Sequence, residues 1–401
     1  MLSEAARPYI QASVPVLREH GLAITSTFYR NLFNAHPELN NLFNMGNQAQ
    51  GVQQQSLAAA VFAYAANIDN LDVLTPVVSR IVHKHASLGI KAEHYPIVGH
   101  HLLGAIKETL GDAATEPLLE AWAEAYTMLA DTLIAEEKRL YAESGVADGE
   151  LSEFIVTQIT QQSELVMSFL LTPADGKPLP AFQPGQYISV AVNFPDGTRQ
   201  LRQYSLSDAP DKPYLRISVK REDAKDESPS GQVSNWLHDH LKLNDRLQIS
   251  QPFGDFTPDI TSADPIVLIS AGVGITPMMS TLNQLAISRP LHEVIFVHAA
   301  RSKSHHSHTD DLDFAIEKMP NLKVVSFYNS VDAAGDFPDY VKEGEMQLAH
   351  LPTWDLNKTN IYLCGPTGFM QKQWQTLLDA GVPKNRLYKE VFGPDLLENL
   401  M

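Results

Sequence analysis

The spacing of hydrophobic residues changes along the chain and predicts three folded regions. From residue 3 to about 142, apolar residues recur every three or four positions, as they do on one face of an α-helix. Several helices of roughly 10 to 20 residues are expected there. Pro37, Pro76, Pro96 and Pro117 stand where the pattern restarts, as prolines at helix starts do. The first region is therefore predicted to be all helix.

The middle region has the pattern of an antiparallel β-sandwich or β-barrel. Short apolar runs alternate with turn residues from Phe154 to about Pro258, and one helical piece at 233–237 interrupts them. From Pro265 onward, apolar runs such as 266–269 and 294–297 alternate with helical stretches, which is typical of a parallel α/β sheet. A polar stretch over 144–149 separates the first two regions. The expected domains are 1–140, 150–262 and 263–401.

The composition fits a folded protein and excludes several classes of partner. Hydrophobic residues make up 44% and charged residues 19% of the 401 residues, which are ordinary values for globular proteins. The net charge is −17 and all three regions are net negative, which argues against binding to nucleic acid or anionic membranes. The single cysteine, Cys364, cannot form an internal disulfide or a cysteine-based metal site. With no signal-peptide pattern and no long apolar run, the sequence predicts a cytoplasmic protein without a transmembrane segment.

Four polar side chains lie on apolar helical stripes, where burial is costly unless they find partners. They are His85 after Leu74, Val78 and Ile81; Tyr29 after Leu22 and Ser26; Gln53 before Leu57, Ala60 and Tyr64; and Glu137 after Tyr126, Leu129 and Leu133. A histidine on such a face can ligate a metal, or it can be a core histidine that bonds a backbone carbonyl. Taken together, the four predict polar groups aimed into an apolar pocket.

With Phe43 in the corner after Asn41 and Leu42, residues 1–140 resemble a bacterial globin, and the whole chain resembles a flavohaemoglobin. The resemblance implies one haem b whose iron is bound by His85. A carboxylate partner on such a histidine pushes electron density onto the iron, and a distal hydroxyl can hydrogen-bond iron-bound oxygen. The other haem-site residues that the resemblance implies are Tyr95 and Glu137 beside His85, Tyr29 and Gln53 on the distal side, and Phe43, Leu57 and Lys84 at the haem.

Two fragments of the middle region, Pro184–Tyr187 and Arg202–Ser207, together resemble the flavin-binding barrel of the ferredoxin–NADP reductase superfamily. Arg202 offers a cationic fork for pyrophosphate, and the Ser205 hydroxyl can hydrogen-bond the flavin N5, where hydride arrives. Backbone N–H groups at the helix start after Gly231 offer a second anion site. The expected FAD-binding residues are Tyr187, Arg202, Gln203, Tyr204, Ser205, Gly231, Gln232, Val233 and Ser234.

A glycine turn follows the first strand of the last region. Its residues are Gly272, Val273, Gly274, Ile275, Thr276 and Pro277. Since Pro277 replaces the third glycine of the dinucleotide fingerprint, the better match is the Gly-x-Gly-x-Thr-Pro of the reductase superfamily. Glycines let the backbone approach the nucleotide, and the helix start attracts its phosphates.

Two further segments match the superfamily. The resemblance implies NAD(P)-site residues Cys364, Gly365 and Pro366, and then Glu390, Val391, Phe392, Gly393 and Pro394, with Phe392 stacked on the flavin. Cys364 is alternatively an ordinary buried thiol. The run 305–308, which contains three histidines, is expected to be an exposed loop rather than a metal site.

The order of these motifs implies an electron pathway from NAD(P)H to FAD to haem. In the family that the chain resembles, haem-bound oxygen then oxidises nitric oxide to nitrate, so the expected activity is that of an NAD(P)H-dependent nitric oxide dioxygenase. Two alternatives are a haem-based oxygen or lipid sensor with a vestigial reductase, and a flavin reductase of peroxides or ferric chelates. The expected partners are oxygen, nitric oxide and NAD(P)H, with room for a lipid in the distal pocket and a monomeric chain. NADH and NADPH stay equally open.

Overall fold

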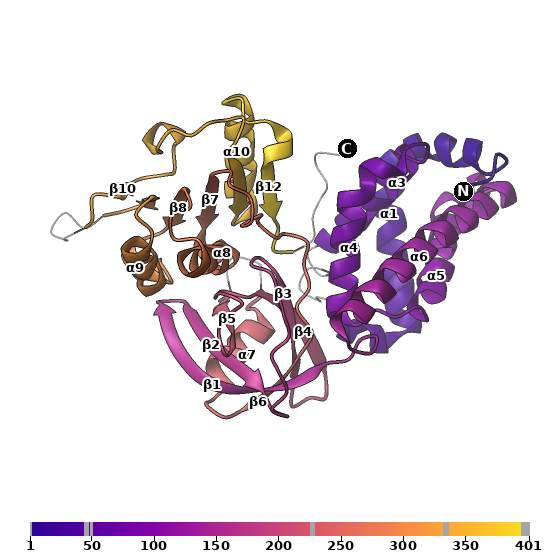
Figure 1. Cartoon of the computed structure of the whole chain (residues 1–401). Helices are drawn as coiled ribbons and strands as arrows, with labels where there is room; N and C mark the ends of the chain where they lie inside the picture. Colours follow the sequence, from indigo (N-terminus) through magenta and orange to yellow (C-terminus); the bar gives the residue numbers. More distant parts are fainter. Residues whose placement is uncertain (1, 44–47, 49–50, 225–228, 332–336, 394–401) are drawn as a thin grey trace. The chain divides into compact units, whose positions relative to one another are not determined.

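The structure, a computed structural model, describes residues 2–43, 48, 51–224, 229–331 and 337–393 (Figure 1). The chain divides into two compact units. One contains the helices of the first 151 residues, and the other contains most of two six-stranded sheets. Each unit is described by itself below.

The first region is all helix, as predicted. Its α-helices are α1 (Arg7–Ala35), α3 (Val52–Ala66), α4 (Thr75–Leu88), α5 (His94–Leu110) and α6 (Glu116–Ser144), with short 3-10 turns at Pro37–Asn41, Leu71–Leu74 and Gly111–Ala113. Prolines stand at the starts of α1, α4 and α6, where the missing N–H costs no helical hydrogen bond. At 29 residues each, α1 and α6 are longer than expected, and Pro15 lies inside α1 without ending it.

The apolar faces of these helices meet in one core. Ile10 and Leu32 of α1, Ala105 of α5 and Ala125 of α6 are fully buried in it. The stripe expected for α1 is partly wrong, because Leu22 is 49% exposed and Ser26 is exposed as well. Most of the buried face of α1 lies one residue earlier, at Gly21, Thr25, Phe28 and Leu32, and it also includes Ile24 and Tyr29.

A short segment joins the last helix of this region to the first strand. Helix α6 ends at Ser144 and β1 begins at Ser152, so residues 145–151 form the connection. Gly145 caps α6 in the left-handed conformation, with φ 70°, as glycine commonly does after a helix.

The middle region forms a sheet with strand order β4-β3-β6-β1-β2-β5. Its elements are β1 (Ser152–Ser163), β2 (Val166–Pro173), β3 (Tyr187–Asn193), β4 (Arg199–Ser205), β5 (Leu215–Lys220), α7 (Gln232–His240) and β6 (Arg246–Ile249). The pairs β1–β2, β1–β6 and β2–β5 are antiparallel, which confirms the predicted sheet type. Helix α7 covers the helical piece expected at 233–237.

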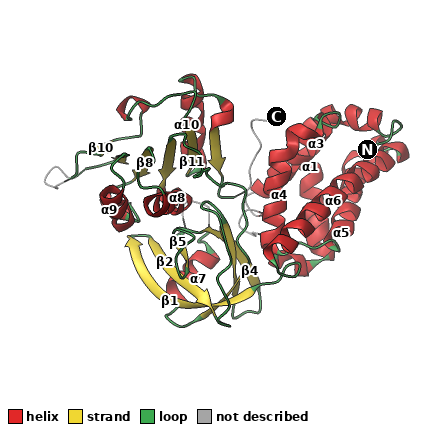
Figure 2. Ribbon diagram, in the orientation of Figure 1, coloured by secondary structure: helices red, strands yellow, loops and turns green. Residues whose placement is uncertain are grey.

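The last region forms a parallel sheet with order β10-β9-β8-β7-β11-β12. Its elements are β7 (Ile266–Ala271), α8 (Ile275–Ser288), β8 (Val294–Ala300), α9 (Thr309–Lys318), β9 (Leu322–Tyr328), β10 (Val341–Glu343), β11 (Asn360–Cys364), α10 (Thr367–Asp379) and β12 (Leu387–Glu390). Helices α8 and α9 pack on one face of the sheet and α10 packs on the other (Figure 2). Both faces are therefore buried, as the continuous apolar runs predict.

The histidine-rich run after β8 is not the exposed loop that we expect from the sequence. His306 is 3% exposed and His308 is fully buried. The His306 ring lies on the ring of His298, with centroids 4.4 Å apart, and its Nδ1 lies 2.8 Å from the Tyr328 hydroxyl. These contacts hold the segment inside the domain. Among the described residues, no group of three or more His, Cys, Asp or Glu side chains is placed to hold a metal ion.

In the part of the chain that the structure describes, no helix combines the length and the apolar character that crossing a membrane requires.

Candidate functional site

The centre of the helical region is a hydrogen-bonded group of three side chains from three helices. His85 lies on α4, Tyr95 on α5 and Glu137 on α6. The His85 Nδ1 lies 2.8 Å from Glu137 Oε1 and 3.0 Å from the Tyr95 hydroxyl. The Tyr95 hydroxyl donates a short hydrogen bond to the same carboxylate oxygen. The structure thus brings together three residues that lie up to 52 positions apart in the sequence.

Burial determines which group donates and which accepts in these hydrogen bonds. Glu137 is 2% and Tyr95 7% exposed, so the carboxylate has little water to replace its two donors. Burial, together with the hydrogen bond to Glu137 and its charge, raises the pKa of Tyr95 far above its ordinary value. Tyr95 therefore stays protonated and acts as a donor to Glu137.

The positions of the protons leave one ring nitrogen of His85 able to bind a metal. A carboxylate only accepts, so His85 donates through Nδ1, and Nε2 carries the free lone pair. A neutral imidazole can ligate haem iron through one nitrogen while its other nitrogen donates to a carboxylate, which makes it a stronger electron donor. His85 and its partners therefore fit a haem. Val78, Leu57 and Phe43, which pack beside the apolar core, offer the kind of surface that a porphyrin contacts, and Lys84 is half-buried on α4 next to His85.

On α1, the Tyr29 hydroxyl lies near two amide side chains. Tyr29 is 6% exposed, and the side-chain amides of Gln53 and Gln48 are close enough to act on its pKa. Burial raises its pKa far above the ordinary value, although the two amides act in the opposite direction, so the hydroxyl keeps its proton. Phe33 and Phe43 surround the ring, with centroids 5.7 Å from that of Tyr29. Gln48 precedes α3 and lies on no periodic stripe of apolar residues, so its position in the sequence does not predict a role at this site.

The expected flavin residues lie on β3, β4 and the start of α7. Gly185 has φ 98°, and a Cβ there would lie 1.9 Å from the Phe256 carbonyl oxygen, so only glycine allows this turn before β3. Tyr187 begins β3 directly after the turn. Strand β4 carries Arg202 to Ser205 in an extended run, in which Ser205 is 6% exposed and Gln203 donates to the Ser189 hydroxyl at 3.1 Å.

The predicted second anion site is the start of α7. Gly231 is the N-cap of the helix, and Gln232, Val233 and Ser234 form its first turn. The amides of a first turn have no helical acceptor and point to where an anion binds. The Ser234 hydroxyl donates to the Gly231 carbonyl at 3.2 Å, which stabilises this turn.

The two glycine motifs of the parallel sheet meet at its carboxyl edge. Gly272 and Val273 follow β7, and Gly365 and Pro366 follow β11, which pairs with β7 directly. A Cβ on Gly274 would lie 2.5 Å from the Cys364 carbonyl oxygen and 2.7 Å from the Gly365 nitrogen, so glycine is required there. Ile275, Thr276 and Pro277 then form the first turn of α8. In parallel sheets, ligands bind at this edge.

Cys364 is fully buried, as in the alternative expectation of an ordinary buried thiol. Burial, followed by the charge of Glu390 in the paired position on β12, raises the pKa of the thiol well above its ordinary value. A neutral thiol is a weak nucleophile. Its backbone, rather than its sulfur, faces the turn at Gly274.

The segment after β12 carries the remaining expected residues. Glu390 ends β12, Val391 packs against one apolar cluster of the domain, and Phe392 is 46% exposed. Gly393 has φ 127°. Pro394 lies outside the described residues.

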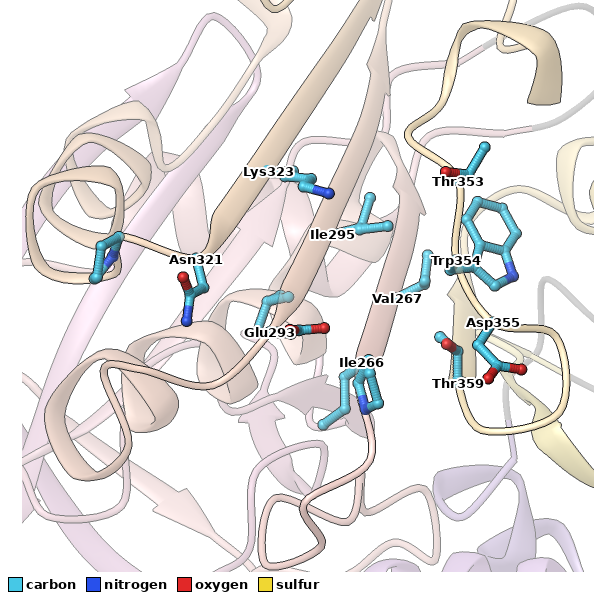
Figure 3. A pocket seen from close by; sticks show the side chains of 13 residues that line it. Ile266, Val267, Glu293, Ile295, Asn321, Lys323, Thr353, Trp354, Asp355 and Thr359 are labelled. Carbon is cyan, nitrogen blue, oxygen red and sulfur yellow. The ribbon is translucent and has the colours of Figure 1, made fainter.

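A cavity lies elsewhere in the parallel-sheet domain. It has a volume of about 590 Å³ and lies at the amino ends of β7 and β8, where Trp354 faces Val267 and Ile295 (Figure 3). Because the glycine motifs occupy the opposite, carboxyl edge of the same sheet, this cavity is not the nucleotide site.

Three family models match the chain in the predicted order. Residues 26–133 match the globin model, residues 153–257 the oxidoreductase FAD-binding domain and residues 268–374 the oxidoreductase NAD-binding domain. These matches and the observed topology confirm the predicted fold class.

Known proteins of the same architecture are similar over nearly the whole chain. The flavohemoprotein of Chromobacterium violaceum is 49% identical, with 98% of each chain covered, and that of Rhizobium meliloti is 46% identical, with 99% covered. The crystal structure of a flavohemoglobin from Malassezia yamatoensis with bound FAD and heme has a TM-score of 0.85 at 31% identity, covering 98% of this chain and 100% of that one.

A second solved structure corresponds to the two sheet domains. It is the flavohem-like FAD/NAD-binding domain of a nitric oxide dioxygenase from Vibrio cholerae, with a TM-score of 0.56 and 39% identity over 61% of this chain and 99% of that one. Full-length similarity at this level, together with the three matching domains, shows that the chain belongs to the flavohemoprotein family.

Proposed function

We propose that the chain is an NAD(P)H-dependent nitric oxide dioxygenase that converts nitric oxide and oxygen into nitrate. Each nitrate takes up one electron, so one NAD(P)H supplies two turnovers. The observation that carries the proposal is the buried contact of His85 with Glu137 and Tyr95, in a chain that also holds the flavin and nucleotide motifs. Further support comes from the similar Vibrio cholerae protein, which is described as a nitric oxide dioxygenase.

When bound, haem supplies the iron at which oxygen and nitric oxide react, and FAD converts a two-electron donor into one-electron steps. In the proposal, His85 Nε2 ligates the iron. Glu137 accepts the Nδ1 proton and places a negative charge behind the ring, which makes the imidazole a stronger electron donor. Tyr95 fixes the carboxylate and keeps it from turning away.

Tyr29 and Gln53 act on the distal side. The Tyr29 hydroxyl keeps its proton and can donate a hydrogen bond to a polarised ligand, and Gln53 offers a nearby amide that can position the hydroxyl or bond the ligand itself. Phe28, Phe33 and Phe43 form an aromatic surround that keeps water out. We also propose that a lipid can bind against these aromatic side chains.

The reductase residues have two tasks. Arg202 binds the pyrophosphate of FAD, and the first turn of α7 offers a second anion site. Tyr187 and Tyr204 offer ring faces, and the Ser205 hydroxyl hydrogen-bonds the flavin N5. These assignments rest on the positions of the residues on β3, β4 and α7. The carboxyl edge of the parallel sheet binds the nicotinamide nucleotide through Gly272–Pro277 and Cys364–Pro366, and Phe392 covers the flavin until the nucleotide enters.

We also propose a cellular compartment and an oligomeric state for the protein. One buried thiol, without a disulfide partner in the sequence, is suited to a reducing compartment, and we assign the chain to the cytoplasm. We also assign it a monomeric state, with oxygen, nitric oxide and NAD(P)H as its small-molecule partners.

The test compares three activities in the purified chain loaded with haem and FAD. Nitrate formation from nitric oxide under air is measured beside reduction of a hydroperoxide and of ferric citrate, all driven by NADH and by NADPH. We expect rapid nitric oxide consumption with one nitrate per nitric oxide. Faster turnover of ferric citrate or hydroperoxide than of nitric oxide would favour a flavin reductase, and no turnover of any substrate would favour a sensor.

Two variants test the roles proposed for His85 and Tyr29. His85→Ala should lose haem and nitric oxide consumption but keep reduction of ferric citrate by flavin. Tyr29→Phe removes one hydrogen bond to a polarised ligand, worth about 1.5–3 kcal/mol, so oxygen should dissociate roughly 10- to 150-fold faster. Haem retained in His85→Ala, or an unchanged oxygen dissociation rate in Tyr29→Phe, would contradict the assignments.

A further inference from the structure

A buried network of charged and polar side chains joins the sheet domain that contains β4 to the parallel-sheet domain, within one compact unit. Its centre is Arg216 on β5, which is 8% exposed. The Arg216 guanidinium contacts Asp311 of α9 through two nitrogens, at 3.1 and 3.0 Å. A buried arginine with a fork of two contacts to one carboxylate fixes both distance and orientation.

The same arginine holds the chain just after β4. Its Nε donates to the Ser207 hydroxyl at 3.2 Å, and a terminal nitrogen donates to the Ser207 carbonyl. Ser207 lies two residues after Ser205, the proposed partner of the flavin N5. One side chain therefore contacts both the flavin strand and helix α9 of the nucleotide domain.

Asp208, which follows β4, connects the flavin strand to helix α8 by hydrogen bonds. Its carboxylate accepts from Asn283 at 2.9 Å, and its backbone carbonyl accepts from the Ser280 hydroxyl at 2.7 Å. Ser280 and Asn283 follow Thr276 by four and seven positions, so all three lie on one face of α8. The helix that begins at the nucleotide turn is thus bonded directly to the segment that ends the flavin strand.

In the nucleotide domain, two further side chains contact Asp311. Asn283 also donates to Asp311 at 3.1 Å, and His308 lies with its Nδ1 2.8 Å from the other Asp311 oxygen. His308 is fully buried and has φ 63°, a conformation that a residue other than glycine adopts only where its surroundings enforce it. The structure holds this histidine in a costly backbone conformation, in which its ring contacts Asp311.

We propose that Arg216, Asp208 and Asp311 are positioning residues for hydride transfer, because they set the nucleotide-binding turn of α8 at a fixed place relative to the flavin strand. They touch neither nucleotide nor flavin in this proposal. A buried ion pair adds little to stability compared with apolar residues of the same volume, and in this proposal its role is to hold one geometry. Hydride transfer depends steeply on such geometry, and a misplacement of about 1 Å costs on the order of 100-fold in rate.

This inference rests on the proposed nucleotide-to-flavin step, and its test isolates that step. Flavin reduction is followed anaerobically by stopped flow, in the full chain loaded with haem and FAD, over a range of NADH and NADPH concentrations. The limiting rate and the apparent nucleotide Kd are obtained separately. Failure of the parent protein to reduce its flavin would refute the proposed function; a parent that works and variants that match it would refute the inference alone.

The main variant is Asp311→Asn, which keeps the size of the side chain and removes its charge. The matched control is Asp239→Asn, an aspartate that also pairs with an arginine, Arg221, but on the surface. We expect Asp311→Asn to lower the limiting rate about 10- to 100-fold, with the FAD content kept and the nucleotide Kd nearly unchanged. The control should match the parent.

A second variant, Asn283→Ala, tests the network without changing a charge. It breaks the contacts to Asp208 and Asp311 together, so it should lower the same limiting rate. A loss of rate that merely follows a loss of FAD would show a structural role and would overturn the inference. An effect on Kd alone would overturn it as well.

Discussion

The charge of Glu137 is the part of the haem site whose effect can be worked out from the structure. Glu137→Gln keeps the size of this 2% exposed side chain and removes its charge. The hydrogen bond from His85 Nδ1, now 2.8 Å long, would change from charge-assisted to neutral. Less electron density then reaches the iron, so the ferrous state is favoured and the haem reduction potential rises.

The size of the shift follows from the strength of that bond. A hydrogen bond to a charged group contributes about 1.5–3 kcal/mol and a neutral one about 0.5–1.5 kcal/mol, a difference on the order of 1–1.5 kcal/mol. For a one-electron couple, about 1.4 kcal/mol corresponds to roughly 60 mV. Only the part of this energy that differs between ferric and ferrous haem changes the potential, so we expect a rise of at most about 60 mV.

The assay is a spectroelectrochemical titration of haem in the purified full chain. Glu136→Gln is the matched control, because Glu136 is the preceding residue of α6 but faces solvent and pairs with Arg139. The control should keep the parent potential. Equal potentials for Glu137→Gln and the parent protein, with haem bound in both, would refute the role of the carboxylate charge.

Two further predictions concern the nucleotide domain. Burial lowers the pKa of His306 to about 4, so between about pH 6.5 and 4 the unfolded chain binds a proton that the folded chain does not, and stability falls as the pH falls through that window. Urea denaturation of the full chain should show that His306→Gln lowers this slope, by up to about 3 kcal/mol across the window, while His305→Gln leaves it unchanged. The buried His298 and His308, whose pKa values burial also lowers, keep their own contributions in both variants, and a slope in His306→Gln equal to that of the parent would contradict the burial argument. Gly274→Ala places a Cβ 2.5 Å from the Cys364 carbonyl oxygen, so it should weaken NADH binding in an anaerobic titration, whereas Gly368→Ala, where a Cβ meets nothing within 4 Å, should not.

The sequence alone predicts the elements of this fold better than the faces they bury. Periodicity distinguishes the helical, antiparallel and parallel regions because each has a different spacing of apolar residues. It misplaces the buried face of α1, since Leu22 and Ser26 are exposed although they share a spacing of three or four with Tyr29. On a helix of 29 residues, several such stripes can be drawn, and only packing against α3 and α5 selects one.

The contacts of the candidate site are likewise only partly predictable from the sequence. Tyr95 and Glu137 beside His85 are expected from the family resemblance, but the spacing of residues alone does not connect them, because the contact spans 52 positions. Arg216 and Asp311 lie 95 positions apart in different domains, and neither lies in a motif. The burial of His306 depends on Tyr328, a partner two elements away, so its polar sequence context is misleading.

The short connection between α6 and β1 has a consequence for how turnover responds to dilution. Residues 145–151 are seven in number, and a chain of that length spans at most about 25 Å when fully extended. A tether this short keeps the electron donor and acceptor modules at an effective concentration on the order of millimolar. In the proposed function, electron delivery to the haem is then a first-order event within one molecule, so nitric oxide consumption per molecule should stay constant when the purified chain is diluted.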